Sequence, residues 1–208
     1  MPLTIEGNNM PNHREKAASG FLHCAPMLEE LAFKLYRSTS NRVYRPDASA
    51  LLLYIGYDSL KAAAILRVIA TYIPAYGEDC RKYLNSLFDK VEALLQQVTS
   101  ETMIENNELS QLMKRLAEVE RELGEKYESL LQTKTLQYLA DEIGRCVHVD
   151  LNVLTAIFEA LEGDKENHNT LLVSAAYCIE SEHLETAIDN TPTVRYQNPD
   201  GWNRPILI

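Results

Sequence analysis

Four residues have the types and spacing to do chemistry inside a helical core: Glu29, Glu120, Lys165 and His168. Lys165 and His168 stand three residues apart in the stretch DKENHNTLL, so a helix carries both on one face. Each glutamate interrupts an apolar pattern that predicts a buried helix face. Two buried carboxylates cannot both stay ionised without a cation, because desolvation and mutual repulsion protonate at least one. We therefore predict a buried charge cluster in which Lys165 supplies positive charge to the two glutamates and His168 adds to it if protonated.

The spacing of apolar side chains predicts the helices that position these residues. Glycine and proline number only eight each, and between them apolar residues recur at steps of three and four, which is typical of packed helices. The pattern predicts an all-α chain with a flexible N-terminal arm over 1–20, a helical domain over 21–188 and a C-terminal arm over 189–208. Asp47 or Ser49 is expected to cap the second helix, and Asp150 the last. The expected helices span 26–38, 47–73, 77–97, 108–133, 135–146 and 150–188.

Polar residues interrupt the apolar faces at matching places in the two halves of the chain. Glu29 stands seven residues before Tyr36, and Glu120 stands seven residues before Tyr127. We interpret both tyrosines as core aromatics that are able to hydrogen-bond the glutamates. The spacings are those of an internal duplication. The same correspondence links Asp58, Ser59, Ala62 and Leu66 to Asp164, Lys165, His168 and Leu172.

The constellation over about residues 22–185 resembles the ferritin-like, rubrerythrin-type superfamily. The resemblance implies a ferritin-like four-helix bundle with a helical crossover. In that family each half supplies one glutamate from its first helix and a Glu-x-x-His pair from its second, and six side chains hold two iron or manganese ions. By position, Glu29 and Glu120 match the two single glutamates, and His168 matches one histidine.

Half of the family's ligand set is replaced in this sequence. Ser59 and Lys165 stand where the glutamates of the two pairs belong, and Ala62 stands where a histidine belongs. One interpretation is that the charge cluster has replaced the dinuclear centre. A second is a residual mononuclear site for iron, manganese or zinc, held by Glu29, Glu120 and His168. A third is that Lys165 extends to solvent and His168 is an ordinary core histidine.

Two functions from different classes follow from these interpretations. The first is a non-catalytic structural or interaction protein that has lost its dinuclear metal, holds no cofactor and forms a homo-oligomer, most simply a dimer. The alternative is an iron- or manganese-dependent oxidoreductase that uses the reduced site. No Ser/His/Asp nucleophile and no glycine-rich phosphate loop is found in the sequence.

Composition narrows the range of partners. The net charge is −10, the pI is about 5.0, and no basic stripe is present, which argues against nucleic acid and anionic membrane as partners. The most apolar stretch, 48–74, is interrupted by Asp58, Lys61 and Arg67, so a buried helix is expected and a membrane span is not. The first twenty residues lack the pattern of a signal peptide, and we expect a cytoplasmic protein.

The remaining motifs favour structural interpretations. The four cysteines are scattered, which favours buried thiols over a zinc cluster or disulfides. Cys146 and His148 are expected in a loop, and Glu180 with His183 is expected to be an exposed pair near the end of the last helix. The NPDG tetrad in the tail predicts a hairpin, with an extended arm as the equal alternative. The cysteines are Cys24, Cys80, Cys146 and Cys178.

Overall fold

A computed structural model describes residues 13–77 and 79–189 of the chain. The described residues form six helices and no strand, which confirms the predicted all-α class. The C-terminal arm or hairpin predicted for 189–208 lies outside the described residues except for Asp189, which ends the last helix. The first twelve residues of the predicted N-terminal arm lie outside them too. The helices are α1 (His13–Ser40), α2 (Pro46–Ala70), α3 (Cys80–Ser100), α4 (Asn106–Leu130), α5 (Thr133–Gly144) and α6 (Leu151–Asp189).

The first helix is longer than the sequence pattern predicts. It begins at His13, well before the expected start at Pro26, which lies inside the helix. A proline inside a helix removes one hydrogen bond and costs about 3 kcal/mol. Phe21 and Leu22, on the turn before the proline, are buried in the core. Their burial offsets the cost, so residues 13–20 belong to the helical domain and not to an arm.

Side-chain caps begin two of the other helices, α6 and α3. Asp150 precedes α6, and its carboxylate accepts a hydrogen bond from the backbone N–H of Asn152 at 2.8 Å, as predicted. Asp79 caps α3 in the same way through the N–H of Arg81. The predicted cap of α2 is wrong, because that helix begins at Pro46 after Arg45 with no side-chain cap. Proline suits the first turn because its missing N–H is not needed there.

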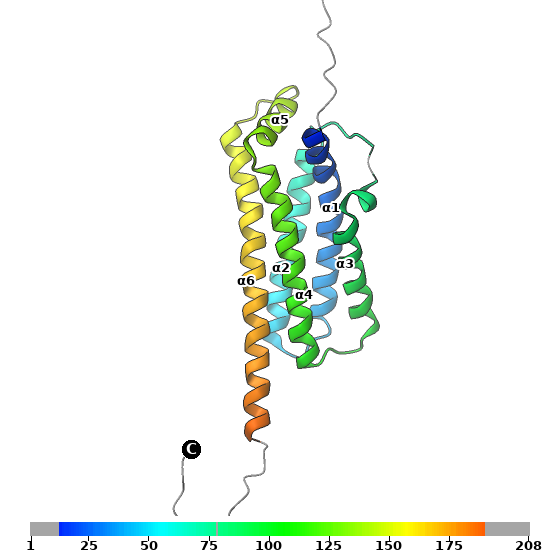
Figure 1. Cartoon of the computed structure of the whole chain (residues 1–208), viewed down its shortest axis with the longest axis vertical. Helices are drawn as coiled ribbons and strands as arrows, with labels where there is room; N and C mark the ends of the chain where they lie inside the picture. Colours follow the sequence, from blue (N-terminus) through cyan, green and yellow to red (C-terminus); the bar gives the residue numbers. More distant parts are fainter. Residues whose placement is uncertain (1–12, 78, 190–208) are drawn as a thin grey trace, which may run out of the picture.

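The long helices pack as two pairs. α1 packs along α2, and α4 packs along α6, while α3 lies on the outer side of α1 and α5 closes one end (Figure 1). The connections α1–α2 and α3–α4 meet at the other end, where the N–H of Ile104 donates to the carbonyl of Arg42 at 2.8 Å. The core-facing residues of α1, α2, α4 and α6 therefore converge on one interior.

The structure corrects the interpretation of the cysteines. Cys24 on α1 and Cys80 at the start of α3 form a disulfide, and both remaining cysteines, Cys146 and Cys178, are exposed. The spacing of single cysteines carries no information on pairing, because the contact depends on how α3 packs against α1. Disulfides persist mainly in oxidising compartments, so the pair lends no support to the predicted cytoplasmic location.

We predict that the disulfide stabilises the fold by tying α3 to α1. Cys24 and Cys80 are 56 residues apart, and closing a loop of this length restricts the unfolded chain by about 2–4 kcal/mol. The Cys24→Ser/Cys80→Ser variant should lose this amount in urea unfolding under oxidising conditions. Reductant should have no further effect on it, whereas a wild type insensitive to reductant would contradict the prediction.

Candidate functional site

An ammonium group lies between two carboxylates in the middle of the structure. Lys165 Nζ on α6 donates a hydrogen bond to Glu29 Oε2 on α1 at 2.8 Å and lies 3.3 Å from Glu120 Oε2 on α4. The side chain of Lys165 is only 2% exposed, and those of both glutamates are fully buried. Lys165 therefore points into the core, and the interpretation in which it extends to solvent is wrong.

Two tyrosines bind the remaining carboxylate oxygens in a reciprocal arrangement. Tyr36 on α1 donates to Glu120 Oε1 on α4 at 2.6 Å, and Tyr127 on α4 donates to Glu29 Oε1 on α1 at 2.7 Å. Each tyrosine thus binds the glutamate of the other half. All four side chains are buried. Every carboxylate oxygen of the two glutamates consequently has a partner within the protein.

His168 joins the cluster at the same oxygen of Glu120 that Lys165 contacts. Its Nδ1 lies 3.4 Å from Glu120 Oε2, and its Nε2 lies 3.1 Å from Asp58 Oδ2 on α2. An imidazolium donates to both carboxylates, whereas a neutral ring donates to only one. The ring also packs edge-on against Tyr54, with centroids 5.8 Å apart. His168 therefore links the interior carboxylates to α2.

A second layer of charges surrounds the histidine end of the cluster. Lys61 Nζ lies 2.8 Å from Asp58 Oδ1 on α2 and 2.9 Å from Asp164 Oδ2 on α6. These two ion pairs connect α2 to α6. The sequence indicated the matching positions of the two aspartates, but it did not identify Asp58 as the partner of His168. Asp58 is half-buried beside Ser59, and the packing of α2 against α6 brings it to His168.

Burial and charge act in opposite directions on the glutamates. Desolvation favours the neutral acid, but the charge of Lys165 and the hydrogen bonds from His168 and Tyr36 outweigh it and hold the pKa of Glu120 at about 2. The pKa of Glu29 is raised, because desolvation and the charge of Glu120 together outweigh Lys165 and Tyr127. Glu29 has the shorter contact to Lys165, but it lacks the histidine. Glu120 is accordingly the more strongly ionised of the two.

The cation and the phenols have pKa values that fit these roles. Desolvation lowers the pKa of Lys165, but the charges of Glu120 and Glu29 dominate and raise it above its ordinary value. Burial next to Glu120 and Glu29 raises the pKa values of Tyr36 and Tyr127 well above 10. Lys165 remains an ammonium and both tyrosines remain neutral hydrogen-bond donors at physiological pH.

The α2 side of the interior carries the small residues. Ser59 and Ala62 are buried there, at the positions that correspond to Lys165 and His168. Among the described residues, Ser59 Oγ is the buried side-chain oxygen or nitrogen that lacks a hydrogen-bond partner. Such an orphan is uncommon in proteins. On α4, Gly124 lies beside Lys165, and a Cβ added at Gly124 would lie 3.4 Å from the Cβ of Lys165.

The residues present do not fit a dinuclear metal centre. An ammonium lies in contact with both carboxylates, and it would repel a further cation at about 4 Å by about 4 kcal/mol at an effective dielectric near 20. Within the described part of the chain, no group of three His, Cys, Asp or Glu side chains is arranged to hold a metal ion. Both glutamates already have protein donors on each oxygen.

Comparisons with protein-family models, curated proteins and solved structures give no match to this chain. The ferritin-like resemblance therefore stays a prediction that depends on residues within this sequence.

The other sequence motifs lie apart from the cluster. Cys146 and His148 are exposed in the connection between α5 and α6. Glu180 lies 2.7 Å from Lys114 and accepts a hydrogen bond from Ser110, both on α4. The side chain of His183 lies outside the described residues.

Removing the buried cation should destabilise the protein strongly. Lys165→Met leaves two carboxylates buried without a counter-charge, which costs about 3–5 kcal/mol and corresponds to a fall of roughly 10 °C in Tm. Lys114→Met is the matched control, because Lys114 pairs with Glu180 on the surface and such pairs contribute about 0–1 kcal/mol. Equal Tm values for the two variants, measured by calorimetry, would contradict the prediction.

The depressed pKa of Glu120 predicts an acid dependence of stability. The ordinary carboxyl value is 4.5 and the folded value is about 2, so its ionisation stabilises the fold above pH 4.5 by on the order of 3 kcal/mol. This contribution is lost as the pH falls toward 2. Glu29 has the opposite effect on stability as the pH falls. Its pKa is raised in the folded state, so protonation of Glu29 favours the folded state. Urea unfolding between pH 6 and 2 should show a smaller loss for Glu120→Gln than for wild type, and parallel curves would refute this.

Proposed function

We propose that the protein is a ferritin-like four-helix bundle in which the ammonium of Lys165 has replaced the dinuclear metal, and that it acts as a non-catalytic structural or interaction protein. The observation that carries the proposal is the position of Lys165 Nζ, in contact with both Glu29 and Glu120. Homo-oligomerisation, most simply as a dimer in the cytoplasm, is part of the proposal. Nucleic acid and membrane are not proposed as partners.

The reciprocal hydrogen bonds support a duplicated bundle origin. Tyr36 to Glu120 and Tyr127 to Glu29 are the same interaction made twice, with the two halves exchanged. The pairing of α1 with α2 and of α4 with α6, with α3 between the halves in the chain, agrees with the helical crossover of the ferritin-like topology. The small buried residues Ser59 and Ala62 stand where the proposal has a lost ligand pair.

A second candidate is a metal-dependent oxidoreductase with a reduced site at Glu29, Glu120 and His168. One observation favours it: a surface hollow of about 180 Å³ between α4 and α6 is lined largely by acidic residues, with Glu120 among the lining residues although its own side chain is fully buried. Such a surface attracts cations. Iron, manganese or zinc would have to displace the ammonium of Lys165 to use the glutamates. The acidic residues are Glu125, Glu128, Glu162 and Glu166.

Metal analysis separates the two functions. The full chain is expressed with added iron or manganese, and metal per chain is measured by mass spectrometry beside Glu120→Ala. We expect substoichiometric metal in wild type and no change in the variant. Near-stoichiometric metal that disappears in Glu120→Ala would overturn the structural function in favour of the enzyme.

Restoring the family's ligands tests the proposed ancestry. The Ser59→Glu/Ala62→His/Lys165→Glu variant supplies one glutamate and one histidine on α2 and a glutamate on α6, which completes a six-ligand set. We expect this variant to bind about two iron ions per chain and to gain thermal stability when iron is added. A folded triple variant that binds no iron would contradict the proposed correspondence of the two halves.

A further inference from the structure

The outward face of α2 is apolar along most of its length. Tyr54, Tyr57 and Val68 are 49%, 60% and 62% exposed, and Leu60 is 37% exposed. Ala50 and Ala64 are exposed on the same helix. Lys61 lies on the same face, 49% exposed, and its ammonium pairs with Asp58 and Asp164. Single exposed apolar residues are ordinary, but several along one helix face mark an interaction surface. The α2 face is defined here as Ala50, Tyr54, Tyr57, Leu60, Ala64 and Val68.

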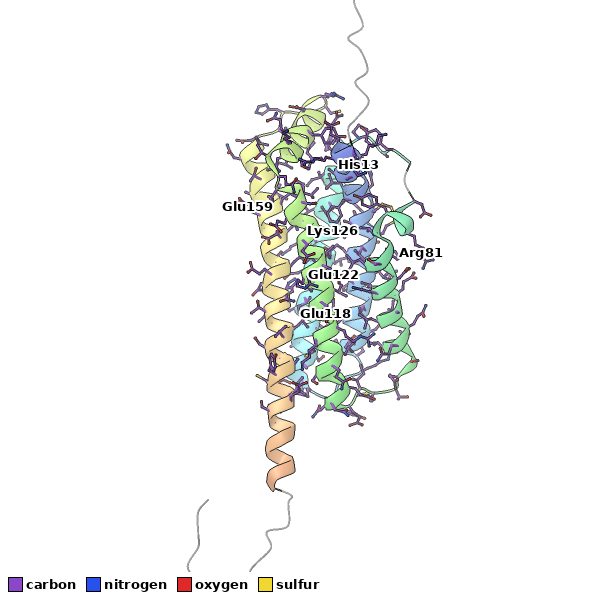
Figure 2. All side chains as sticks on the ribbon, viewed as in Figure 1. His13, Arg81, Glu118, Glu122, Lys126 and Glu159 are labelled. Carbon is purple, nitrogen blue, oxygen red and sulfur yellow. A yellow bond between two sulfur atoms is a disulfide. The ribbon has the colours of Figure 1, made fainter. Side chains whose placement is uncertain are left out.

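The outward face of α4 shows the contrast within the same molecule. Glu118, Glu122 and Lys126 follow one another along α4 on the face toward the viewer (Figure 2), and Arg121 pairs with Glu125 beside them. Charged residues at these steps are what a solvated helix surface carries. α2 lies behind α4 in this view (Figure 1), so the apolar row belongs to a different side of the protein.

We infer that the α2 face binds the same face of a second copy of the chain, with the two α2 helices antiparallel about a two-fold axis near Tyr57. The inference rests on the homo-oligomer of the proposed function and names its interface. In a two-fold interface the same patch meets itself, so the patch must be self-complementary. Aromatic residues such as Tyr57 are enriched at the centre of such interfaces.

The sequence of α2 is self-complementary about Tyr57. In this register Tyr54 of one copy faces Leu60 of the other, and Ala50 faces Ala64. Bulky residues therefore face bulky residues near the axis, and small residues face small residues farther out. Tyr57 is held in place by Phe33 on α1, with ring centroids 5.7 Å apart. The close approach of two helices is easiest where small residues face each other, as the two alanines do.

The charged residues near the two ends of α2 favour the same antiparallel register about Tyr57. Asp47 lies ten residues before Tyr57 and Arg67 ten residues after it, so the antiparallel arrangement brings Asp47 of each copy next to Arg67 of the other. The side chain of Asp47 is 65% exposed and that of Arg67 is 51% exposed. Within the same chain Asp47 pairs with Arg45, and Arg67 pairs with Glu30. A parallel arrangement would place like charges together.

A membrane is the competing occupant of this face. α2 is long and apolar enough to cross a bilayer by length and composition, but 39% of its most apolar window is buried within the protein. Lys61 and Asp58 also interrupt the apolar sequence of α2, and their charged groups lie 2.8 Å apart. The chain's net charge of −10 further disfavours anionic lipid. A second copy of the chain fits these features better.

The first test places a charge on the two-fold axis. Tyr57→Glu puts two carboxylates opposite each other, and we expect the dimer dissociation constant of the full chain to rise on the order of a hundredfold by sedimentation velocity. Tyr177→Glu is the matched control, because Tyr177 is 62% exposed on α6. Its dissociation constant should stay within about threefold of wild type. Circular dichroism and Tm of the diluted variants show that folding is unchanged.

The second test uses the predicted ion pairs. Asp47→Arg and Arg67→Asp should each weaken self-association by about three- to tenfold, because each creates two like-charge pairs across the axis. An equimolar mixture of the two variants restores both pairs and should form the mixed dimer at wild-type strength, measured by native mass spectrometry. A merely structural effect of either substitution would not be rescued by mixing.

The results of these tests separate a failure of the α2 interface from a failure of the proposed homo-oligomer. A wild-type chain that sediments as a monomer at the 23.6 kDa chain mass would overturn both the homo-oligomer and the interface. A dimer that resists Tyr57→Glu would overturn the α2 interface and leave the homo-oligomer standing. A monomer that binds vesicles of phosphatidylcholine and phosphatidylglycerol, and releases them in Tyr57→Glu, would identify lipid as the occupant and overturn the inference.

Discussion

The structure depends on the neutralisation of carboxylates buried between helices. Glu29 and Glu120 come from α1 and α4, and the ammonium of Lys165 on α6 reaches both. A buried carboxylate is tolerated only with a counter-charge and a full set of hydrogen bonds, so the contacts fix how these three helices lie against one another. His168 extends the requirement to α2 through Asp58. Four helices thus share one electrostatic constraint.

This constraint explains why the interior combines polar groups with small apolar residues. The long side chain of Lys165 enters from α6 with Gly124 beside it on α4, while α2 contributes Ser59 and Ala62. Tyr36 and Tyr127 complete the hydrogen bonding of the carboxylates and remain neutral donors, because burial raises their pKa values. Buried polar networks of this kind set the relative register of helices more than they add net stability.

Periodicity predicted the fold class and the residues that meet, because burial and helical spacing are local properties of the sequence. The predicted core positions Glu120, Lys165 and His168 are all buried. The start of α1 at His13 was not predicted, because proline is ordinarily found in the first turn of a helix and Pro26 therefore predicted a start there. The burial of Phe21 and Leu22 compensates for the proline. The Cys24–Cys80 disulfide and the Asp58–His168 contact join segments far apart in the chain. Such contacts depend on tertiary packing, which spacing alone does not encode.

The most direct measurement of the central claim is the protonation of the Lys165 side chain. In protein labelled with ¹⁵N-lysine, and with Lys165→Met used for assignment, NMR can follow each Nζ through an alkaline titration. We expect the Lys165 ammonium to exchange slowly with water and to stay protonated above pH 10.5, the ordinary lysine value. A Lys165 amine that exchanges like the surface lysines, or loses its proton below that value, would contradict the account.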